Sequence, residues 1–157
     1  MERRLIMREE RVTINLLNWL EGNGWKIVCY NFPQSGTGVL LHPNTDENRT
    51  TKNKGGIIPD ILATRNSIAV FFENKDRFVL SDFEKIKEVK KLGNYSNALD
   101  TILKEFNVTK IFYGIGIPAN EKDIKKSLEC IDGIDFLIST SEDKSVEINF
   151  DEYGILP

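Results

Sequence analysis

Short apolar runs alternate with polar, glycine-containing segments along the chain, and the spacing of the apolar residues predicts helices and strands. From residue 2 to 21, apolar side chains recur at steps of three and four, as on one face of a helix, and Gly22 and Gly24 end this pattern. Over residues 25–32, apolar and polar side chains alternate, which predicts a strand. A polar segment largely without periodicity, residues 33–56, follows and predicts a loop that is long for a compact domain.

Two apolar strands joined by a tight polar turn form the next predicted unit. Residues 57–64 and 67–75 are rich in β-branched and aromatic side chains, which favour strands. Arg65 and Asn66 lie between them as the expected turn. The sequence therefore predicts an antiparallel hairpin in this region.

Helices and strands alternate in the second half of the chain. Ser81 and Glu84 match a capping box, which would open a helix that stops at Gly93. The run Lys110–Ile117 is almost continuously apolar, as in a strand buried on both faces, and Pro118 ends it. The other predicted elements are helices at 94–106 and 121–131 and strands at 136–140 and 145–150. This order predicts an α/β fold with a mixed sheet flanked by helices.

Composition narrows the class of protein. A chain of 157 residues with 40% hydrophobic and 29% charged residues predicts a single domain, residues 1–157, with a real core. Its longest apolar runs are far too short to cross a bilayer, and no signal-peptide apolar region follows the basic N-terminus. We therefore expect a cytoplasmic protein without a membrane partner. The net charge of −3 argues only weakly against a nucleic-acid partner, because the distribution of positive charge decides binding, and segment 49–54 is basic.

Cysteine and histidine offer little chemistry. Cys29 and Cys130 lie in apolar contexts without a CxxC spacing and are expected to be reduced, buried thiols. His42, the single histidine, has no partner at a metal-ligand spacing and is expected on the surface or in a loop. Zinc chemistry and Ser-His-Asp chemistry are therefore poorly supported.

Charged residues at the ends of the predicted hairpin do suggest chemistry. Residues equidistant from an antiparallel turn face each other, so Asp60 falls near the level of residues 71–72 and close to Glu73. Lys75 shares a face with Glu73 by the period of two. Two carboxylates held together repel unless a cation lies between them, and a hard divalent ion such as Mg²⁺ is the simplest such cation.

These residues also resemble a known motif. Pro59-Asp60, followed after twelve residues by Glu73-Asn74-Lys75, is similar to the motif of the PD-(D/E)xK nuclease superfamily, which includes many restriction endonucleases and Holliday-junction resolvases. The resemblance covers about residues 5–117 and leaves 118–157 as a C-terminal α/β extension. It implies a restriction-endonuclease-like core of the order α-β-β-β-α-β.

The resemblance also implies roles for the motif residues. Asp60 and Glu73 would bind Mg²⁺, with Mn²⁺ as a substitute, and the carbonyl of Asn74 would be a further ligand. Lys75 would assist the attacking water or stabilise charge on the phosphate. The alternative is that Asp60 and Glu73 are ordinary strand-end charges and that Lys75 only extends its ammonium to solvent.

Members of the superfamily often add a carboxylate from the first helix. Glu10 lies on the helical stripe of Thr13 and Leu17, whereas Glu9 lies on that of Thr13 and Leu16. We expect Glu10 to point toward the sheet and to join the catalytic residues. For either residue the alternative is a solvated glutamate on the helix surface.

Several polar residues are candidates for contacts with DNA. Ser35, in the Ser-Gly loop, is placed to reach a phosphate, and the insertion 42–56 carries Arg49, Lys52 and Lys54, which are suited to phosphate contacts. The alternatives are a simple turn and a solvated loop.

Two further groups of residues follow the motif. Tyr95 and Asn97 are the nearest equivalents of a polar residue that some superfamily members carry after the lysine. The lysines of the capped helix suit a salt-bridged surface as well as a DNA face, and they are Lys85, Lys87, Lys90 and Lys91.

The sequence thus predicts a Mg²⁺-dependent DNA endonuclease, most in keeping with a restriction or defence role. A Holliday-junction resolvase or DNA-repair nuclease is the second interpretation, and a non-catalytic DNA-binding or assembly subunit is the alternative from another class. Because one such site cuts one strand, we expect a homodimer or a heteromeric partner subunit for duplex cleavage.

Overall fold

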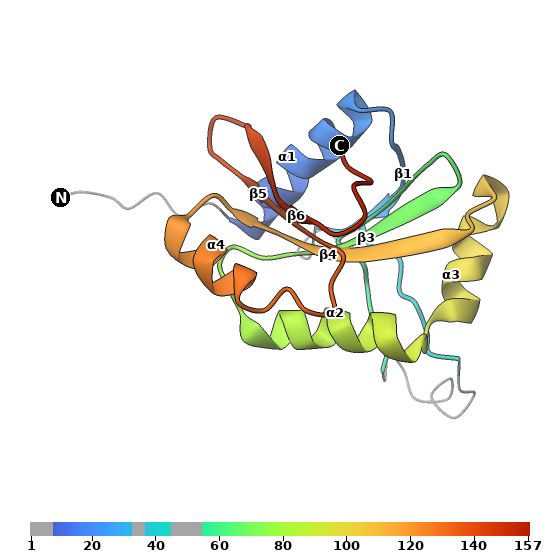
Figure 1. The fold of residues 1–157 in the computed structure, drawn as a ribbon. Helices are drawn as coiled ribbons and strands as arrows, with labels where there is room; N and C mark the ends of the chain where they lie inside the picture. The colour runs from blue at the N-terminus through green and yellow to red at the C-terminus, as the bar shows by residue number, and fades with distance from the viewer. Residues whose placement is uncertain (1–7, 33–36, 45–54) are drawn as a thin grey trace.

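A six-stranded mixed sheet with helices on both faces forms the centre of the protein (Figure 1). The computed structural model describes residues 8–32, 37–44 and 55–157. The strands are β1 (Lys26–Tyr30), β2 (Ile61–Arg65), β3 (Ile68–Asn74), β4 (Lys110–Pro118), β5 (Phe136–Thr140) and β6 (Val146–Asp151). The helices are α1 (Glu9–Gly22), α2 (Leu80–Leu92), α3 (Ser96–Leu103), the 3₁₀ helix η2 (Lys104–Phe106) and α4 (Glu121–Leu128). The expected α/β class, with a mixed sheet flanked by helices, is confirmed.

The sheet follows the order of the chain, β1-β2-β3-β4-β5-β6. The strands β1, β2 and β3 form an antiparallel meander, β4 and β5 continue parallel to β3, and β6 returns antiparallel at the far edge. Each parallel connection carries helices, as such crossovers require. In β4, the residues Phe112–Ile117 are buried, as expected of a central strand covered on both faces.

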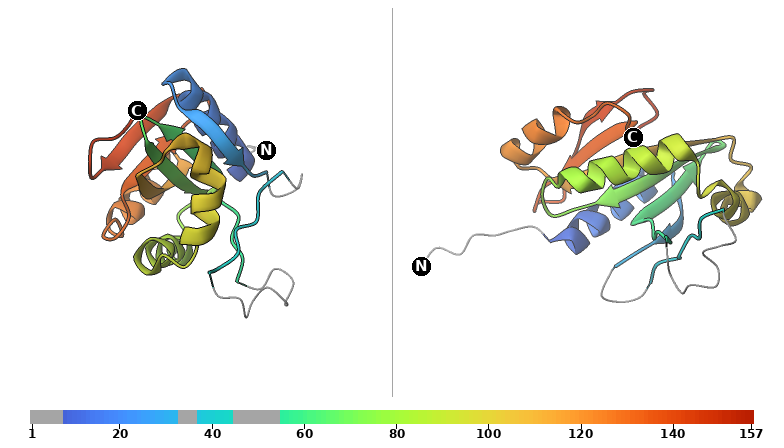
Figure 2. Two further views of the ribbon diagram at one scale, coloured as in Figure 1. Left: turned by 90° about the vertical axis from the view of Figure 1, so that its right-hand side faces the viewer. Right: turned by 90° about the horizontal axis from the view of Figure 1, so that it is seen from below.

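Side chains alternate between two cores along the meander. Ile61 and Phe72 pack with α1 on one face of the sheet. Leu62 and Phe71 pack on the other face, with the apolar side chains of α2, α3 and α4. Figure 2 shows α2 lying across the strands on this second face, opposite α1. A side chain on either strand is thus assigned to a face by its parity.

The β2–β3 hairpin turns one residue later than predicted. Asn66 and Ser67 form the turn, with φ of 52° and 68°, in the left-handed region that tight two-residue hairpin loops use. Arg65 therefore pairs with Ile68, rather than standing in the turn. This shift of register brings Asp60 to the level of Glu73 itself.

The capping box predicted at Ser81 and Glu84 is wrong. The helix α2 begins at Leu80 after Val79, so that Ser81 lies within the first turn. An apolar contact replaces the capping box, because the rings of Phe78 and Phe83 pack with their centroids 5.3 Å apart across the helix start. Such a hydrophobic staple fixes the entry of the chain into the helix.

Other boundaries differ by a few residues. The strand predicted from residue 57 begins only at Ile61, and Ile57 instead forms an isolated bridge with Leu41. The helix predicted over 94–106 is divided between α3 and η2.

The cysteines and the histidine lie largely as expected. Cys29 and Cys130 are free, the first buried and the second half-buried, and burial raises the pKa of the Cys29 thiol to about 11. His42 is exposed. Within the described ranges, the helices are all too short or too polar to cross a membrane.

Candidate functional site

Two buried carboxylates lie side by side where β2 begins and β3 ends. Asp60 precedes Ile61 and Glu73 follows Phe72, and these two apolar residues are paired in the hairpin. Because Ile61 and Phe72 face α1, Asp60 and Glu73 both point to the face covered by α2. They are only 5% and 6% exposed. The backbone pairing of the hairpin therefore holds two acids together in a poorly solvated place.

Hydrogen bonds to Asp60, to α1 and to β4 fix the end of β3. The backbone N–H of Asn74 donates to Oδ2 of Asp60 at 2.7 Å, and its side-chain Nδ2 donates to Oγ1 of Thr13 at 3.0 Å. The N–H of Lys75 donates to the carbonyl of Gly116 at 3.0 Å. A methyl group at Gly116 would clash with the Asn74 side-chain oxygen, so the glycine permits this close approach.

Crossed ion pairs connect the end of β3 to α2. Lys85 Nζ lies 3.2 Å from Oε1 of Glu73, and Lys75 Nζ lies 3.9 Å from Oδ1 of Asp82. The two lysine side chains are 42% and 31% exposed, respectively, whereas the carboxylates are largely covered. The lysine side chains are therefore more accessible to solvent than the carboxylates with which they pair.

The local electrostatics favour an added cation. Burial, and then the charge of Glu73, raise the pKa of Asp60 to about 8, although the Asn74 N–H opposes the shift. Burial also raises the pKa of Glu73 despite the nearby ammonium of Lys85. Burial thus favours the neutral, protonated form of Asp60 as long as no further positive charge is supplied.

Glu9, rather than the expected Glu10, is the first-helix carboxylate beside the site. Burial raises the pKa of Glu9, and Lys75 is the cation that most opposes that shift. Glu10 is exposed. The physical reason is the phase of α1, whose buried residues include Val12 and Thr13, three and four positions after Glu9.

Lys75 is surrounded by acids. Its partial burial lowers the pKa, but the carboxylates of Glu9, Asp82, Glu73 and Asp60 raise it by more, so that the net shift is upward. The ammonium of Lys75 is therefore fully charged at neutral pH.

The donor set fits a hard divalent cation. Asp60 and Glu73 offer carboxylate oxygens, and Oδ2 of Asp82 is buried with no hydrogen-bond partner among the described residues. The described part of the chain contains no group of three or more His, Cys, Asp and Glu side chains that could hold a metal ion. Mg²⁺ commonly takes only one or two protein carboxylates and completes its shell with water and phosphate oxygens. The Asn74 side chain faces α1, which leaves its backbone carbonyl as the group available for the predicted role.

The residues predicted to contact DNA all lie outside the described ranges. They are Ser35, Arg49, Lys52 and Lys54. The structure does place the residues that flank segment 45–54. Asn44 Oδ1 accepts a hydrogen bond from the N–H of Asn97 at 3.0 Å, and the hydroxyl of Tyr95 donates to the carbonyl of Gly55 at 2.5 Å. Tyr95 and Asn97 thus hold both flanks of the basic segment to the start of α3.

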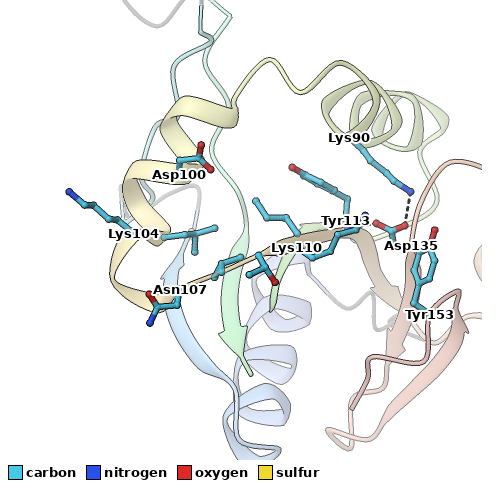
Figure 3. Close-up of a pocket in the computed structure, with 12 residues that line it drawn as sticks. Lys90, Asp100, Lys104, Asn107, Lys110, Tyr113, Asp135 and Tyr153 are labelled. Carbon is cyan, nitrogen blue, oxygen red and sulfur yellow. Dashed lines mark hydrogen bonds and ion pairs between the residues drawn. The ribbon is translucent and has the colours of Figure 1, made fainter. Parts of the chain in front are cut away.

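A separate cavity of about 560 Å³ lies toward the other end of α2 (Figure 3). Within it, Lys90 Nζ donates to Oδ1 of Asp135 at 2.6 Å, and Oδ2 of Asp135 accepts from the N–H of Tyr113 at 2.9 Å. In Figure 3 the side chain of Lys104 points away from this pair. Both carboxylate oxygens of Asp135 are therefore used within the fold.

Asp82 and Lys85 are site residues that the sequence did not reveal as such. The interpretation of Ser81 to Glu84 as a capping box gave Asp82 no role, and Lys85 was expected either on a salt-bridged surface or on a DNA face. One signal was available, because Asp82 is in phase with Ile86 and Val89, two buried residues of α2. An acid on the buried stripe of a helix needs a partner.

Comparison with known proteins gives little guidance. No protein-family model and no curated protein matches the chain. A solved structure, that of an FdxN element excision controlling factor protein from Anabaena variabilis, is similar to it at 16% sequence identity, with 88% of this chain and 95% of that chain covered and a TM-score of 0.42. At this level, the likeness carries no conclusion about family or activity.

Proposed function

We propose that the protein is a Mg²⁺-dependent DNA endonuclease of the PD-(D/E)xK type. The observation that carries the proposal is the pair of buried carboxylates, Asp60 and Glu73, on paired strands, with the ammonium of Lys75 two residues further on. The order of elements, one helix, a three-stranded meander, helices and a parallel strand, agrees with a restriction-endonuclease-like core. Fold alone does not define function, so the residues carry the proposal.

Asp60 and Glu73 would hold the ion. Mg²⁺ bound there would supply Lewis acidity and neutralise the charge that develops on a phosphodiester during hydrolysis. The protein holds both carboxylates in place before the ion arrives, through the strand pairing and the hydrogen bond from Asn74 to Asp60. Such preorganisation lowers the cost of binding.

Lys75 would act as a fixed positive charge. Because its pKa is raised, it keeps its protons at neutral pH and is unsuited to accept one as a general base. It would instead donate hydrogen bonds to a phosphate oxygen as negative charge builds up there. Glu9 and Asp82 lie near it and would orient its ammonium.

A restriction or defence role is the one that we favour, with two copies or a partner subunit for cleavage of both strands. The basis is the insertion 42–56 of the sequence, whose flanks are held by Asn97 and Tyr95. A junction resolvase, a repair nuclease and a non-catalytic DNA-binding subunit remain distinguishable by assay.

The test is cleavage of supercoiled plasmid, linear duplex and a four-way junction, each with Mg²⁺ or with EDTA. We expect cutting that requires the metal and that Asp60→Ala and Lys75→Ala abolish, while Lys104→Ala, a change at an exposed lysine of η2, cuts as the wild type does. A fixed cut position indicates restriction, and a preference for the junction indicates a resolvase. Identical products from wild type and from both site variants would overturn the proposal, and DNA binding without cutting would favour the non-catalytic subunit.

A further inference from the structure

We propose that Lys85 is an internal counter-ion, which neutralises Glu73 in the metal-free protein and is displaced by the divalent cation to bind a phosphate of the DNA. The inference rests on the proposed function and deepens it. It assigns to α2 a role in coupling metal binding to substrate binding.

Lys85 contacts one of the two carboxylates that the proposed function assigns to the metal. The ammonium nitrogen lies 3.2 Å from Oε1 of Glu73, on the side of the sheet to which Asp60 also points. Lys75, the other lysine of the site, lies against Asp82 instead. Lys85 thus contacts Glu73, one of the two buried acids, directly.

A divalent cation and this ammonium compete for the same carboxylate. Two positive charges within a few ångströms repel strongly where water is largely excluded. Binding of an ion by Asp60 and Glu73 therefore weakens the Lys85 contact, and the lysine contact weakens binding of the ion. By linkage, removal of the lysine must strengthen the ion's affinity.

The displaced ammonium of Lys85 can move into solvent. The Lys85 side chain is 42% exposed, while the neighbouring residues Phe83 and Ile86 anchor the helix in the core. Its four-carbon stem lets the charge turn outward while the backbone stays fixed. A phosphate of a strand bound at the metal would meet this charge there, and Asp82, one turn earlier on α2, would keep it near the site.

An ordinary stabilising ion pair makes a different prediction. If Lys85 served only to hold Glu73 in place, its removal would disorder the carboxylate and weaken metal binding or leave it unchanged. The sign of the change in metal affinity therefore separates the two roles.

The experiment is a calorimetric titration with Mn²⁺ alone, without DNA, of wild type, Lys85→Gln, Lys85→Arg and Lys91→Gln. We expect Lys85→Gln to bind Mn²⁺ about three- to fivefold more tightly than the wild type. This change in affinity corresponds to the free energy of a partly exposed ion pair. Lys85→Arg, which keeps the charge, and Lys91→Gln, which removes a charge elsewhere on α2, should stay within about twofold of wild type. At saturating Mg²⁺, cleavage by Lys85→Gln should nevertheless fall about tenfold, because a phosphate contact is lost.

The outcomes separate this inference from the endonuclease proposal. Tighter Mn²⁺ binding together with slower cleavage supports the displacement role. Unchanged or weaker Mn²⁺ binding by Lys85→Gln, beside normal binding by wild type, overturns it and leaves the endonuclease proposal standing. Absence of Mn²⁺ binding by wild type at millimolar concentration overturns both.

Discussion

The two ends of α2 hold buried carboxylates in opposite ways. At the C-terminal end, Asp135 is 2% exposed and is satisfied by one lysine, Lys90, and by one backbone N–H. At the N-terminal end, two acids, Asp60 and Glu73, lie together, and the lysine in direct contact with them among the described residues, Lys85, pairs with Glu73. At one site the buried acid has its own cation, whereas at the other Lys85 pairs with Glu73 and burial favours the protonated form of Asp60.

The difference teaches where to look for function. A balanced, fully hydrogen-bonded pair needs nothing from outside and serves to hold α2 to β4 and β5. A buried acid without a cation of its own is held protonated, and a divalent cation that binds there would release this proton and pair with the carboxylate. The cavity in Figure 3 surrounds the balanced pair, so the presence of a cavity alone does not identify the reactive end of the helix.

The largest expected effect is on catalysis. Glu73→Gln should slow Mg²⁺-dependent cleavage by about a thousandfold or more, because it weakens the ion site that stabilises the transition state by several kcal/mol. Asp135→Asn, the matched change at the other end of α2, should leave the rate per folded molecule within about threefold. Rates of plasmid nicking measure both, and equal losses in the two variants would refute the contrast.

Stability should show the reverse order. Lys90→Met leaves Asp135 buried without its cation and should cost about 3 kcal/mol in the free energy of unfolding. Lys85→Met removes a half-exposed lysine whose partner can take up a proton, and should cost less than about 1 kcal/mol. Urea denaturation at pH 6 in EDTA measures both, and a larger loss in Lys85→Met would contradict the account.

The pH dependence of stability should reveal the uncompensated acid. The pKa of Asp60 is raised to about 8 in the folded protein from 3.8, so between these values the folded state binds more protons than the unfolded state and stability falls as pH rises. Asp60→Asn removes this penalty. In EDTA it should become more stable than wild type by on the order of 1–3 kcal/mol at pH 8, and by little at pH 4.

Thermal unfolding across this pH range checks the prediction, with Asp135→Asn as the control. A stability difference between wild type and Asp60→Asn that does not grow from pH 4 to pH 8 would mean that Asp60 is not held protonated.

The smallest effect concerns the first helix. Glu9→Gln should slow cleavage about fivefold, because Glu9 helps to orient the ammonium of Lys75. Glu10→Gln, one position along the same helix, changes an exposed side chain and should cut at the wild-type rate. A larger loss of cleavage rate in Glu10→Gln than in Glu9→Gln would instead support Glu10 as the first-helix carboxylate, as the sequence pattern predicts.

Much of the fold follows from the sequence, because period and turn chemistry are local. The central strand around Phe112–Ile117 and the β2–β3 hairpin are examples. The hairpin turn was placed one residue too early, which shifts the strand pairing by two residues, since the pattern alone did not distinguish a turn at Arg65-Asn66 from one at Asn66-Ser67. That single residue decides whether Asp60 and Glu73 are level.

The candidate site was only partly predictable, because it joins segments distant in the chain. Its motif residues lie on one hairpin and could be found from spacing. Asp82 and Lys85 reach it through the packing of α2 against the sheet, and Glu9 reaches it through the phase of α1. Helical phase gave a local signal for Asp82, but the groups that these side chains meet depend on tertiary packing, which local patterns do not encode.

Crystals soaked in Mn²⁺ would test the central claim most directly, through anomalous scattering from the ion. The account predicts one strong anomalous peak about 2.2 Å from carboxylate oxygens of both Asp60 and Glu73, with the Lys85 ammonium turned away from Glu73 and no peak at Asp135. The account would be contradicted if the crystals showed no peak between Asp60 and Glu73 although the same protein cleaves DNA in solution. A peak at Asp135 instead would also contradict it.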